Sequence, residues 1–531
     1  MRRKGPTTPA HSPELSYRVF EIVSPCPPTS LGRLLPDGYT LALGAERLVE
    51  RSYLDTHDWR LWTAGASLIS ETAEGVTSLV WRPPHAGAVT VPRWSLPRLA
   101  ADLPEGAVRR ELHPLIGERA LLVHGSVLVH QRAGGIRNAC HKIVIRAWWE
   151  RGQCLDARGH PTGRPLTSLR VEGVLGYEGA WRALVASLEA APFLQTPAET
   201  ELQRAAGARG RAPGDYSSRL DIQLTPEMPA AEATRLILRR LLHMASANLA
   251  GTVEDVDPEF LHDLRVAVRR ARSALGQLAG CYDEIRHAPL REELRWLGGI
   301  TGACRDLDVF LADLRGYQGE LGSDTGEWLA PLVEEVARQR TEQHAALRAA
   351  LTSARLRRAL GLWRRLTEPP RRPARAPEAQ RPAGEVGAER VRRAYQRLRR
   401  HARRLPVPAP PEGLHRLRID AKKLRYLLEF FASLWGRRGA ALIRHLKELQ
   451  DALGVFNDLA VQQRRLAEIL QALLARGEVA VPTALAAGRL AALLEERQTV
   501  QRSAIAERLE AFFARQIRAE VASLGDSGEE V

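Results

Sequence analysis

Two stretches of this chain, 153 residues apart, share one pattern of basic and apolar residues. The first, LHDLRVAVRRARSALGQL, begins at Leu261, and the second, LHRLRIDAKKLRYLLEFF, begins at Leu414. In both, apolar residues recur at intervals of three and four, which is the period of an amphipathic helix. An internal repeat of this kind predicts a helical domain built from two similar halves.

The basic residues of each copy share one face of the predicted helix. At 100° per residue, positions i, i+3, i+7 and i+10 fall within an arc of about 80°. These positions hold His262, Arg265, Arg269 and Arg272 in the first copy and His415, Arg418, Lys422 and Arg425 in the second, with Arg270 and Lys423 beside them. Unrelieved like charge at this spacing disfavours a helix. We therefore expect the two faces to hold an anion, the alternative being an ordinary solvated surface.

The repeat continues downstream at an offset of 152. The corresponding residues are Gly302, Arg305 and Asp306 with Gly454, Asn457 and Asp458, and Arg295 with Lys447. A glycine followed closely by Asp is typical of a point where one helix ends and the next begins. We therefore expect helices at 288–303 and 305–317, and at 438–453 and 456–476. Arg355 and Arg358, in a further arginine-rich segment, are expected to extend the basic surface.

The character of the sequence changes near residue 229. Before it, short apolar segments broken by Gly and Pro predict an α+β domain of antiparallel strands that form a tunnel or barrel. After it, longer segments with helical periodicity predict an all-α domain of two pseudo-symmetric bundles. The expected divisions are a tail at 1–12, the α+β domain at 13–200, a linker at 201–228 and the helical domain at 229–531. Within the helical domain, the halves 229–367 and 385–525 flank a proline-rich linker at 368–384.

Charge and cysteine content limit the partners and the compartment. The net charge is +15 and the pI is about 10.2, which favours anionic partners without distinguishing nucleic acid, a membrane surface and polyphosphate. The five cysteines are scattered and form no CxxC pair, so neither a disulfide framework nor a zinc site is expected. With no apolar run of membrane-spanning length and no apolar signal segment, we expect a cytoplasmic protein without a membrane partner.

The paired motifs HDLRVAVRRAR with CRDLDVF, and HRLRIDAKKLRYLLE with LGVFND, resemble the CHAD domain (conserved-histidine α-helical domain) over about residues 230–525. The resemblance implies two helical bundles related by pseudo-twofold symmetry, a basic central surface that binds inorganic polyphosphate, and association with polyphosphate granules. The residues expected to bind polyphosphate are His262, Arg265, Arg269, Arg270, Arg272, Arg295, Arg355, Arg358, His415, Arg418, Lys422, Lys423, Arg425 and Lys447.

Residues 14–190 resemble the CYTH (triphosphate tunnel) domain. The resemblance lies in VERSYLDTHDWRLWTAGASLISETAEGVTSLVWRPP, where a Tyr-Asp-Thr run precedes a short helix and two strands, and in the closing helix GYEGAWRALVASLEAAP. Active members of that family carry an ExExK motif that holds a divalent metal and phosphate. Here Glu14 keeps the first position, but Ser16 and Arg18 replace the second carboxylate and the lysine. We therefore expect a degenerate domain without catalytic or metal-binding residues, for which Mg²⁺ or Mn²⁺ would be a cofactor only if activity were retained.

Three functions remain open on the sequence. The favoured one is polyphosphate binding by the helical domain. The second is a metal-dependent inorganic triphosphatase in which the helical domain tethers the substrate. The third is binding of the nucleic-acid backbone through the same basic faces.

Overall fold

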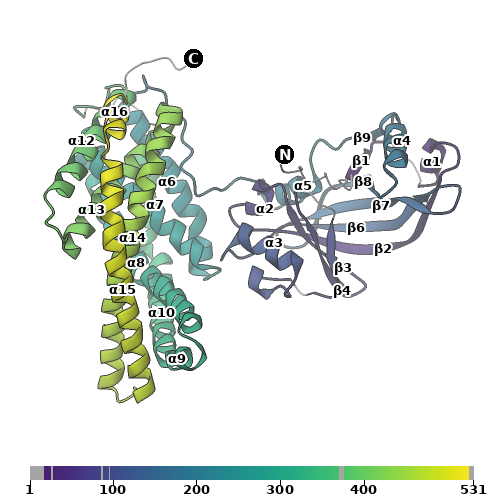
Figure 1. Ribbon diagram of the computed structural model, residues 1–531. Coiled ribbons are helices and arrows are strands. Elements are labelled where there is room, and N and C mark those ends of the chain that lie inside the picture. The colour runs from purple at the N-terminus through teal and green to yellow at the C-terminus, as the bar shows by residue number, and fades with distance from the viewer. Residues whose placement is uncertain (1–16, 25–27, 85–87, 95, 370–375, 525–531) are drawn as a thin grey trace, which may run out of the picture. The chain divides into compact units, whose positions relative to one another are not determined.

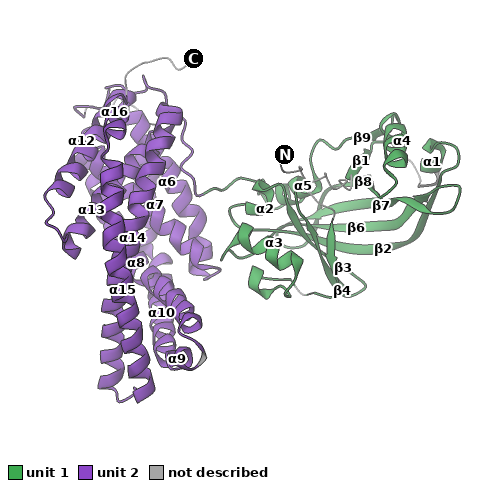
Figure 2. Ribbon diagram, in the orientation of Figure 1, with its two compact units in different colours: residues 1–217 green, residues 218–531 purple. Residues whose placement is uncertain are grey.

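The computed structural model describes residues 17–24, 28–84, 88–94, 96–369 and 376–524. The chain divides into two compact units, residues 1–217 and 218–531 (Figure 2). The stretch 201–228, expected to be a linker, contains a helix of the first unit, α5 (Glu201–Gly207). The Thr200 hydroxyl accepts from the Gln203 backbone N–H and the Gln203 side chain accepts from Thr200, which is a capping box that starts a helix in spite of the small-residue composition.

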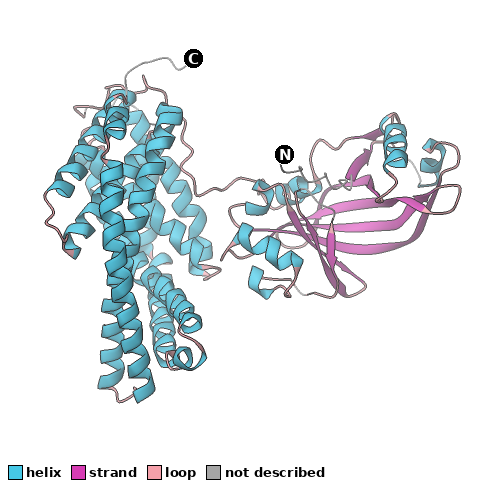
Figure 3. Ribbon diagram, in the orientation of Figure 1, coloured by secondary structure: helices cyan, strands magenta, loops and turns pink. Residues whose placement is uncertain are grey.

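The first unit contains an antiparallel sheet, whose strands are magenta in Figure 3. Within the described residues the sheet has nine strands, in the order β5-β4-β3-β2-β6-β7-β8-β1-β9. This confirms the expected fold class. The strands are β1 Tyr17–Ile22, β2 Thr40–Asp55, β3 Ser67–Ala73, β4 Val76–Arg82, β5 Val89–Val91, β6 Leu122–Arg137, β7 Ile143–Leu155, β8 Pro161–Gly173 and β9 Leu194–Gln195. The helices are α1 Pro28–Leu31, η1 Gly32–Leu34, α2 Arg60–Thr63, η2 Ala100–Asp102, α3 Ala107–Ile116, α4 Glu178–Glu189 and α5.

Helix α5 lies against strand β6 of this sheet. A Cβ atom at Gly125 of β6 would come within 2.5 Å of the Ala205 backbone, so glycine is needed for the helix to approach this closely. Ala205 and Ala206 are fully buried at the contact. The helix therefore belongs to the core of the first unit.

The second unit is helical, and no described helix is long and apolar enough to cross a membrane. Its helices are α6 Ala230–Val253, α7 Pro258–Gln277, α8 Glu284–Glu320, α9 Ser323–Glu327, α10 Ala330–Leu351, α11 Ala354–Thr367, α12 Ala383–Arg403, α13 Pro411–Phe430, α14 Ala432–Ala475, α15 Val481–Phe512 and α16 Arg515–Ala522 (Figure 1). The repeated motifs form α7 and α13, as predicted.

The start of α6 and the start of α12 are equivalent in the repeat, and they pair with each other. The Ala230 N–H donates to the Arg381 carbonyl (2.9 Å), and the Ala383 N–H donates to the Met228 carbonyl (2.7 Å). The repeat offset of 153 relates the two bonds, because Ala230 corresponds to Ala383 and Met228 corresponds to Arg381. Reciprocal bonds of this kind require a local twofold axis, so the two halves have pseudo-twofold symmetry. They also place part of the expected proline-rich linker in an ordered ladder.

The expected helix junctions near Gly302 and Gly454 are wrong. Helix α8 is continuous from 284 to 320, and α14 continues through Gly454 after a non-helical residue at Gly436 (φ 46°). A glycine inside a helix costs only about 1 kcal/mol relative to alanine, which the packing of a long helix readily offsets. Asp306 and Asp458 consequently lie in mid-helix, where they do not act as caps.

Candidate anion-binding site

A cavity of about 580 Å³ in the helical unit is lined by residues of α7, α8, α13 and α14. The first copy contributes His262, Arg265, Arg269 and Arg272, and the second contributes Arg418 and Lys422. The two basic faces recognised in the sequence therefore meet at one cavity.

Residues of α8 and α14 also line this cavity as equivalent pairs. The pairs at an offset of 152 are Asp306 with Asp458, Val309 with Val461 and Phe310 with Gln462. Because equivalent residues of both halves line one space, the cavity lies on the pseudo-twofold axis. Side chains of both copies of the repeat therefore face one space.

Two equivalent arginines are held in place by equivalent aspartates. Arg265 donates to Asp306 (3.5 Å) and to the Gly298 carbonyl (3.2 Å), while Arg418 donates to Asp458 (3.2 Å). Burial lowers the pKa of both guanidiniums, and Arg269 lowers it further against the opposing effect of the aspartates. Both nevertheless stay protonated, because an arginine in a protein does not lose its proton near neutral pH. The aspartates therefore orient two cations at the cavity wall.

Arg269 and Lys422 occupy equivalent positions in the repeat. Both line the cavity, where Lys422 has Arg269 and Arg418 as charged neighbours. No carboxylate among the described residues lies within ion-pairing distance of Arg269. Burial, followed by Arg269 and Arg418, lowers the pKa of Lys422 from 10.5 to about 7, with Asp458 acting in the opposite direction. Burial is the largest cause of this lowered pKa, and the neighbouring arginines add to it more than Asp458 opposes it.

The basic faces are more compensated than the sequence predicts, because carboxylates come from other helices and from outside the basic stripe. Besides Asp306 and Asp458, the cavity contains Asp313, whose pKa is raised by burial. Seven Arg and Lys side chains line the cavity against these three aspartates, which leaves a surplus of four positive charges when all are ionised. The surplus still favours an anionic ligand.

Several residues expected to bind polyphosphate lie outside the cavity lining. Arg270 pairs with Glu429 (2.7 Å), Arg355 pairs with Glu293 (2.8 Å), and His415 is hydrogen-bonded through Nδ1 to Asn457 (2.7 Å). Those with no place in the lining are Arg270, Arg295, Arg355, Arg358, His415, Lys423, Arg425 and Lys447. Of these, His415 contacts the lining through a hydrogen bond, because its partner Asn457 lines the cavity.

Arg272 lines the cavity, whereas its equivalent Arg425 does not. Arg425 donates to Glu429 (2.7 Å) and to Gln450 (3.0 Å). At the equivalent positions, the first copy has Gly276 and Gly298, which offer no side chain to bind Arg272. The second copy therefore fixes its arginine within the bundle, and the first copy leaves its arginine at the cavity.

The sequence reasoning missed two cations of the cavity, Arg305 and Arg465. Arg305 donates to the Pro258 carbonyl (3.1 Å) and lies 3.5 Å from Glu259. Its position next to Asp306 in a repeated motif was a usable signal. Arg465 gave no such signal, because its equivalent in the first copy is Asp313.

We expect Gly302→Ala to weaken anion binding by about threefold to tenfold, the loss of part of one charge-assisted hydrogen bond. A Cβ atom at Gly302 would lie 2.5 Å from Nη1 of Arg265 and displace that guanidinium from the wall. The matched control is Gly454→Ala, because a Cβ at Gly454 meets nothing within 4 Å. Calorimetric titration of both variants with tripolyphosphate measures the difference, and equal affinities would contradict the role of Gly302.

The interior of the first unit is organised around Arg51 of β2. Its guanidinium is nearly buried and bonds to Glu71 (2.9 Å), Glu150 (2.9 Å) and Glu201 (2.7 Å). Burial alone would raise the pKa of Glu150, but Arg51 and Arg170 outweigh it and hold the pKa below its ordinary value. Since Glu201 belongs to α5, this ion cluster fastens the helix to the sheet.

These carboxylates do not fit a divalent cation. Each of the three already binds the guanidinium of Arg51, and a metal ion among them would lie against that positive charge. Of the expected motif, Glu14 and Ser16 lie outside the described residues. Arg18 is exposed on β1 and donates to the Tyr17 carbonyl (3.1 Å).

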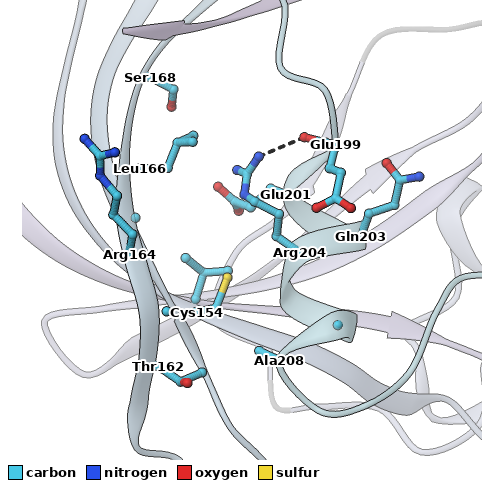
Figure 4. Close-up of a pocket in the computed structure, with 14 residues that line it drawn as sticks. Cys154, Thr162, Arg164, Leu166, Ser168, Glu199, Glu201, Gln203, Arg204 and Ala208 are labelled. Atoms are coloured by element: carbon cyan, nitrogen blue, oxygen red, sulfur yellow. Dashed lines mark hydrogen bonds between the residues drawn. The ribbon is translucent and has the colours of Figure 1, made fainter. Parts of the chain in front are cut away.

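A second cavity, of about 360 Å³, lies beside α5 in this unit. Figure 4 shows Arg204 and Glu199 on one side, where Arg204 donates to the Glu199 carbonyl (2.8 Å), and Arg164 on the other side. Glu201, Gln203 and Cys154 also line it. Acidic and basic groups are mixed here, in contrast to the cavity of the helical unit, so it has no comparable preference for an anion.

Comparison with known proteins bears on the helical unit. Residues 236–467 match the family model of the CHAD domain, and every residue that lines the basic cavity falls within this range. No curated protein matches the chain significantly.

Solved structures that are similar to this chain include the following three. The CHAD domain from the plant Ricinus communis is 28% identical, with a TM-score of 0.45, and the match covers 55% of this chain and 96% of that one. PptA from Streptomyces chartreusis is 20% identical, with a TM-score of 0.44, over 53% of this chain and all of that one. A candidate adenylate cyclase from Bacillus halodurans is 17% identical, with a TM-score of 0.27, over 36% of this chain and 96% of that one. On the family match, the helical unit of this chain contains a CHAD domain at residues 236–467.

Proposed function

We propose that the cavity of the helical unit binds inorganic polyphosphate, in granule association or in polyphosphate homeostasis. The observation that carries this proposal is the meeting of the two basic faces at one cavity with a surplus of positive charge. Polyphosphate has about one negative charge on each phosphate and no other group to recognise. A wall of guanidinium groups suits it, because arginine binds phosphate oxygens through paired, charge-assisted hydrogen bonds.

The individual side chains divide this task. Arg265 and Arg418 are pre-oriented by Asp306 and Asp458, which reduces the entropy lost when a ligand binds. Arg269 has no paired carboxylate among the described residues, so a phosphate relieves its repulsion from Arg418 and Lys422. Binding therefore replaces unfavourable contacts between cations with favourable contacts to an anion.

The cavity is less suited to nucleic acid. Proteins that bind single strands stack the bases on exposed aromatic side chains, and the aromatic residue in the lining, Phe310, is only 3% exposed. A duplex carries its phosphates on a stiff rod that cannot enter a cavity of this size, whereas a chain of phosphates can. We therefore assign the preference to polyphosphate.

Competition binding with the full-length protein tests this function. Fluorescently labelled polyphosphate is bound at physiological salt and challenged with unlabelled polyphosphate, duplex DNA and single-stranded RNA at matched phosphate concentration. We expect only polyphosphate to displace the label efficiently. Equal competition by DNA or RNA would instead establish a general binder of phosphate backbones.

We expect polyphosphate affinity to fall by about tenfold or more as the pH rises from 7 to 9, through titration of Lys422. The pKa of Lys422 is about 7 in the free protein, and a bound polyanion raises it by favouring the charged amine. The bound state therefore holds an extra proton, which is lost as the pH rises. Titrations at several pH values should show this slope in the wild type and a flat profile in Lys422→Arg between pH 7 and 9. A slope that persists in the variant would assign the effect to another group.

A further inference from the structure

Lys422 is the one lysine among the residues that line the basic cavity. The chain has only five lysines among its 77 basic residues, namely Lys4, Lys142, Lys422, Lys423 and Lys447. The other six Arg and Lys residues that line the cavity are all arginines. They include Arg269, the equivalent of Lys422 in the first copy. The second copy of the repeat therefore places a single amine where the first has a guanidinium.

The surroundings of this amine are those of a reactive lysine. The charged groups that face it are Arg269 from α7, Arg418 and Arg425 from its own helix, and Asp458 from α14. Burial and the three arginines favour the neutral amine, and Asp458 opposes them less strongly. A substantial fraction of the side chain is consequently unprotonated at neutral pH, whereas an ordinary lysine is almost wholly protonated.

The same arginines that deprotonate the amine also attract phosphate. A small reagent that carries a phosphate group beside an electrophilic carbon would be concentrated in the cavity with that carbon near the amine. Acyl phosphates have this structure, and phosphate is also their leaving group. The cavity of about 580 Å³ admits molecules of this size.

We propose that Lys422 is a site of acylation by acyl phosphates, with the donor's phosphate held by Arg269 and Arg418. The nitrogen lone pair forms a bond to the acyl carbon, and the bond from that carbon to the phosphate oxygen breaks. Inorganic phosphate leaves with the electron pair, and the nitrogen releases one proton to solvent. The product is an amide, and no other reactant is consumed.

Acylation removes one positive charge and adds bulk at the centre of the cavity. This consequence rests on the proposed function: an acylated protein binds polyphosphate more weakly because Lys422 no longer contributes a cation. Acyl phosphates and polyphosphate would then compete for one site, the former by covalent modification.

The test is incubation of the full-length protein with acetyl phosphate at pH 7.5, followed by peptide mass spectrometry. Lys423 is the internal control, because it is adjacent in sequence but lies outside the cavity lining. We expect Lys422 to be acetylated at least about tenfold faster than Lys423, the advantage of an amine already deprotonated at this pH. Inorganic tripolyphosphate should slow the reaction at Lys422 and leave the rate at Lys423 unchanged.

Variants and a second reagent separate the two parts of the proposal. Arg269→Gln should slow acetylation of Lys422 by acetyl phosphate more than acetylation by an uncharged N-hydroxysuccinimide ester, because only the former needs a phosphate site. Lys422→Arg should lose the label at 422 and keep it at Lys423. Equal rates at Lys422 and Lys423 in the wild type would overturn the proposal.

Failure of the acylation proposal and failure of the proposed function give different results. Selective acetylation of Lys422 in a protein that does not bind polyphosphate in titrations overturns the function and keeps the acylation site. Tight polyphosphate binding with an unreactive Lys422 overturns the acylation site and keeps the proposed function.

Discussion

Replacing Arg269 and Arg418 together by alanine is expected to weaken polyphosphate binding by at least about 100-fold, since each charge-assisted hydrogen bond to an anion contributes about 1.5–3 kcal/mol. The two residues come from different copies of the repeat and line the same cavity. Calorimetric titration of the full-length variant with tripolyphosphate and with long-chain polyphosphate measures the loss. Circular dichroism should show unchanged helicity, because the substitutions remove charge from a crowded cavity wall and alanine favours a helix.

The matched control is the double variant Arg416→Ala and Arg464→Ala. Both arginines are exposed, lie on α13 and α14, and are absent from the cavity lining, so the control loses the same formal charge. We expect its affinity to stay within about threefold of the wild type, the size of a screened long-range effect. If both double variants lose affinity equally, net charge rather than the cavity governs binding.

Replacing Arg51 by methionine is expected to destabilise the first unit by about 3–5 kcal/mol, the usual effect of removing one partner from a buried ion pair. The arginine is 4% exposed, and Glu150 at 3% exposure would keep only part of its compensation. Without Arg51, Glu201 loses its ion pair, so α5 should loosen from the sheet. Scanning calorimetry that resolves the transition of the first unit, together with proteolysis near α5, measures both effects.

Arg47 of the same strand provides the control for this prediction. It is exposed and donates to the neutral side chain of Gln131 (3.0 and 2.7 Å). Arg47→Met should therefore change the stability of the first unit by no more than about 0.5–1 kcal/mol. Arg51→Lys should destabilise the first unit less than Arg51→Met and more than Arg47→Met, because an ammonium group keeps the charge but lacks the planar fork that reaches several carboxylates. An Arg51→Met protein as stable as the wild type would show that the cluster contributes nothing net.

Local pattern was enough to predict the principal elements of the fold. Period-two alternation predicted the antiparallel sheet, and period-three-to-four recurrence predicted α7 and α13 at nearly their observed bounds. The pattern failed where a local signal competes with long-range packing. Gly302 resembles a helix end when read alone, but in α8 it is the place where Arg265 from α7 lies. Likewise, the small residues of α5 are typical of a linker when the sequence is read alone. In the structure they allow the helix to pack closely against Gly125 of β6.

Six of the fourteen residues expected to bind polyphosphate line the cavity, and eight do not. The helical period correctly placed His262, Arg265, Arg269 and Arg272 on one face, and all four line the cavity. The period gives no information on which residues of other helices meet that face. Arg465 was therefore not predicted. Arg425 was expected on the basic face, but its hydrogen bonds to Glu429 and Gln450 hold it outside the cavity lining.

The sequence by itself determined the duplication, the two basic helix faces and the change from sheet to helices, because each of these depends on the spacing of residues along the chain. Only the tertiary structure decided that the two faces meet at one cavity and that aspartates from α8 and α14 orient its arginines. It also decided that a single lysine, Lys422, lies beside Arg269 and Arg418 in that cavity. These properties depend on distances between segments more than thirty residues apart, and electrostatic interactions are set by such distances and by burial rather than by order along the chain.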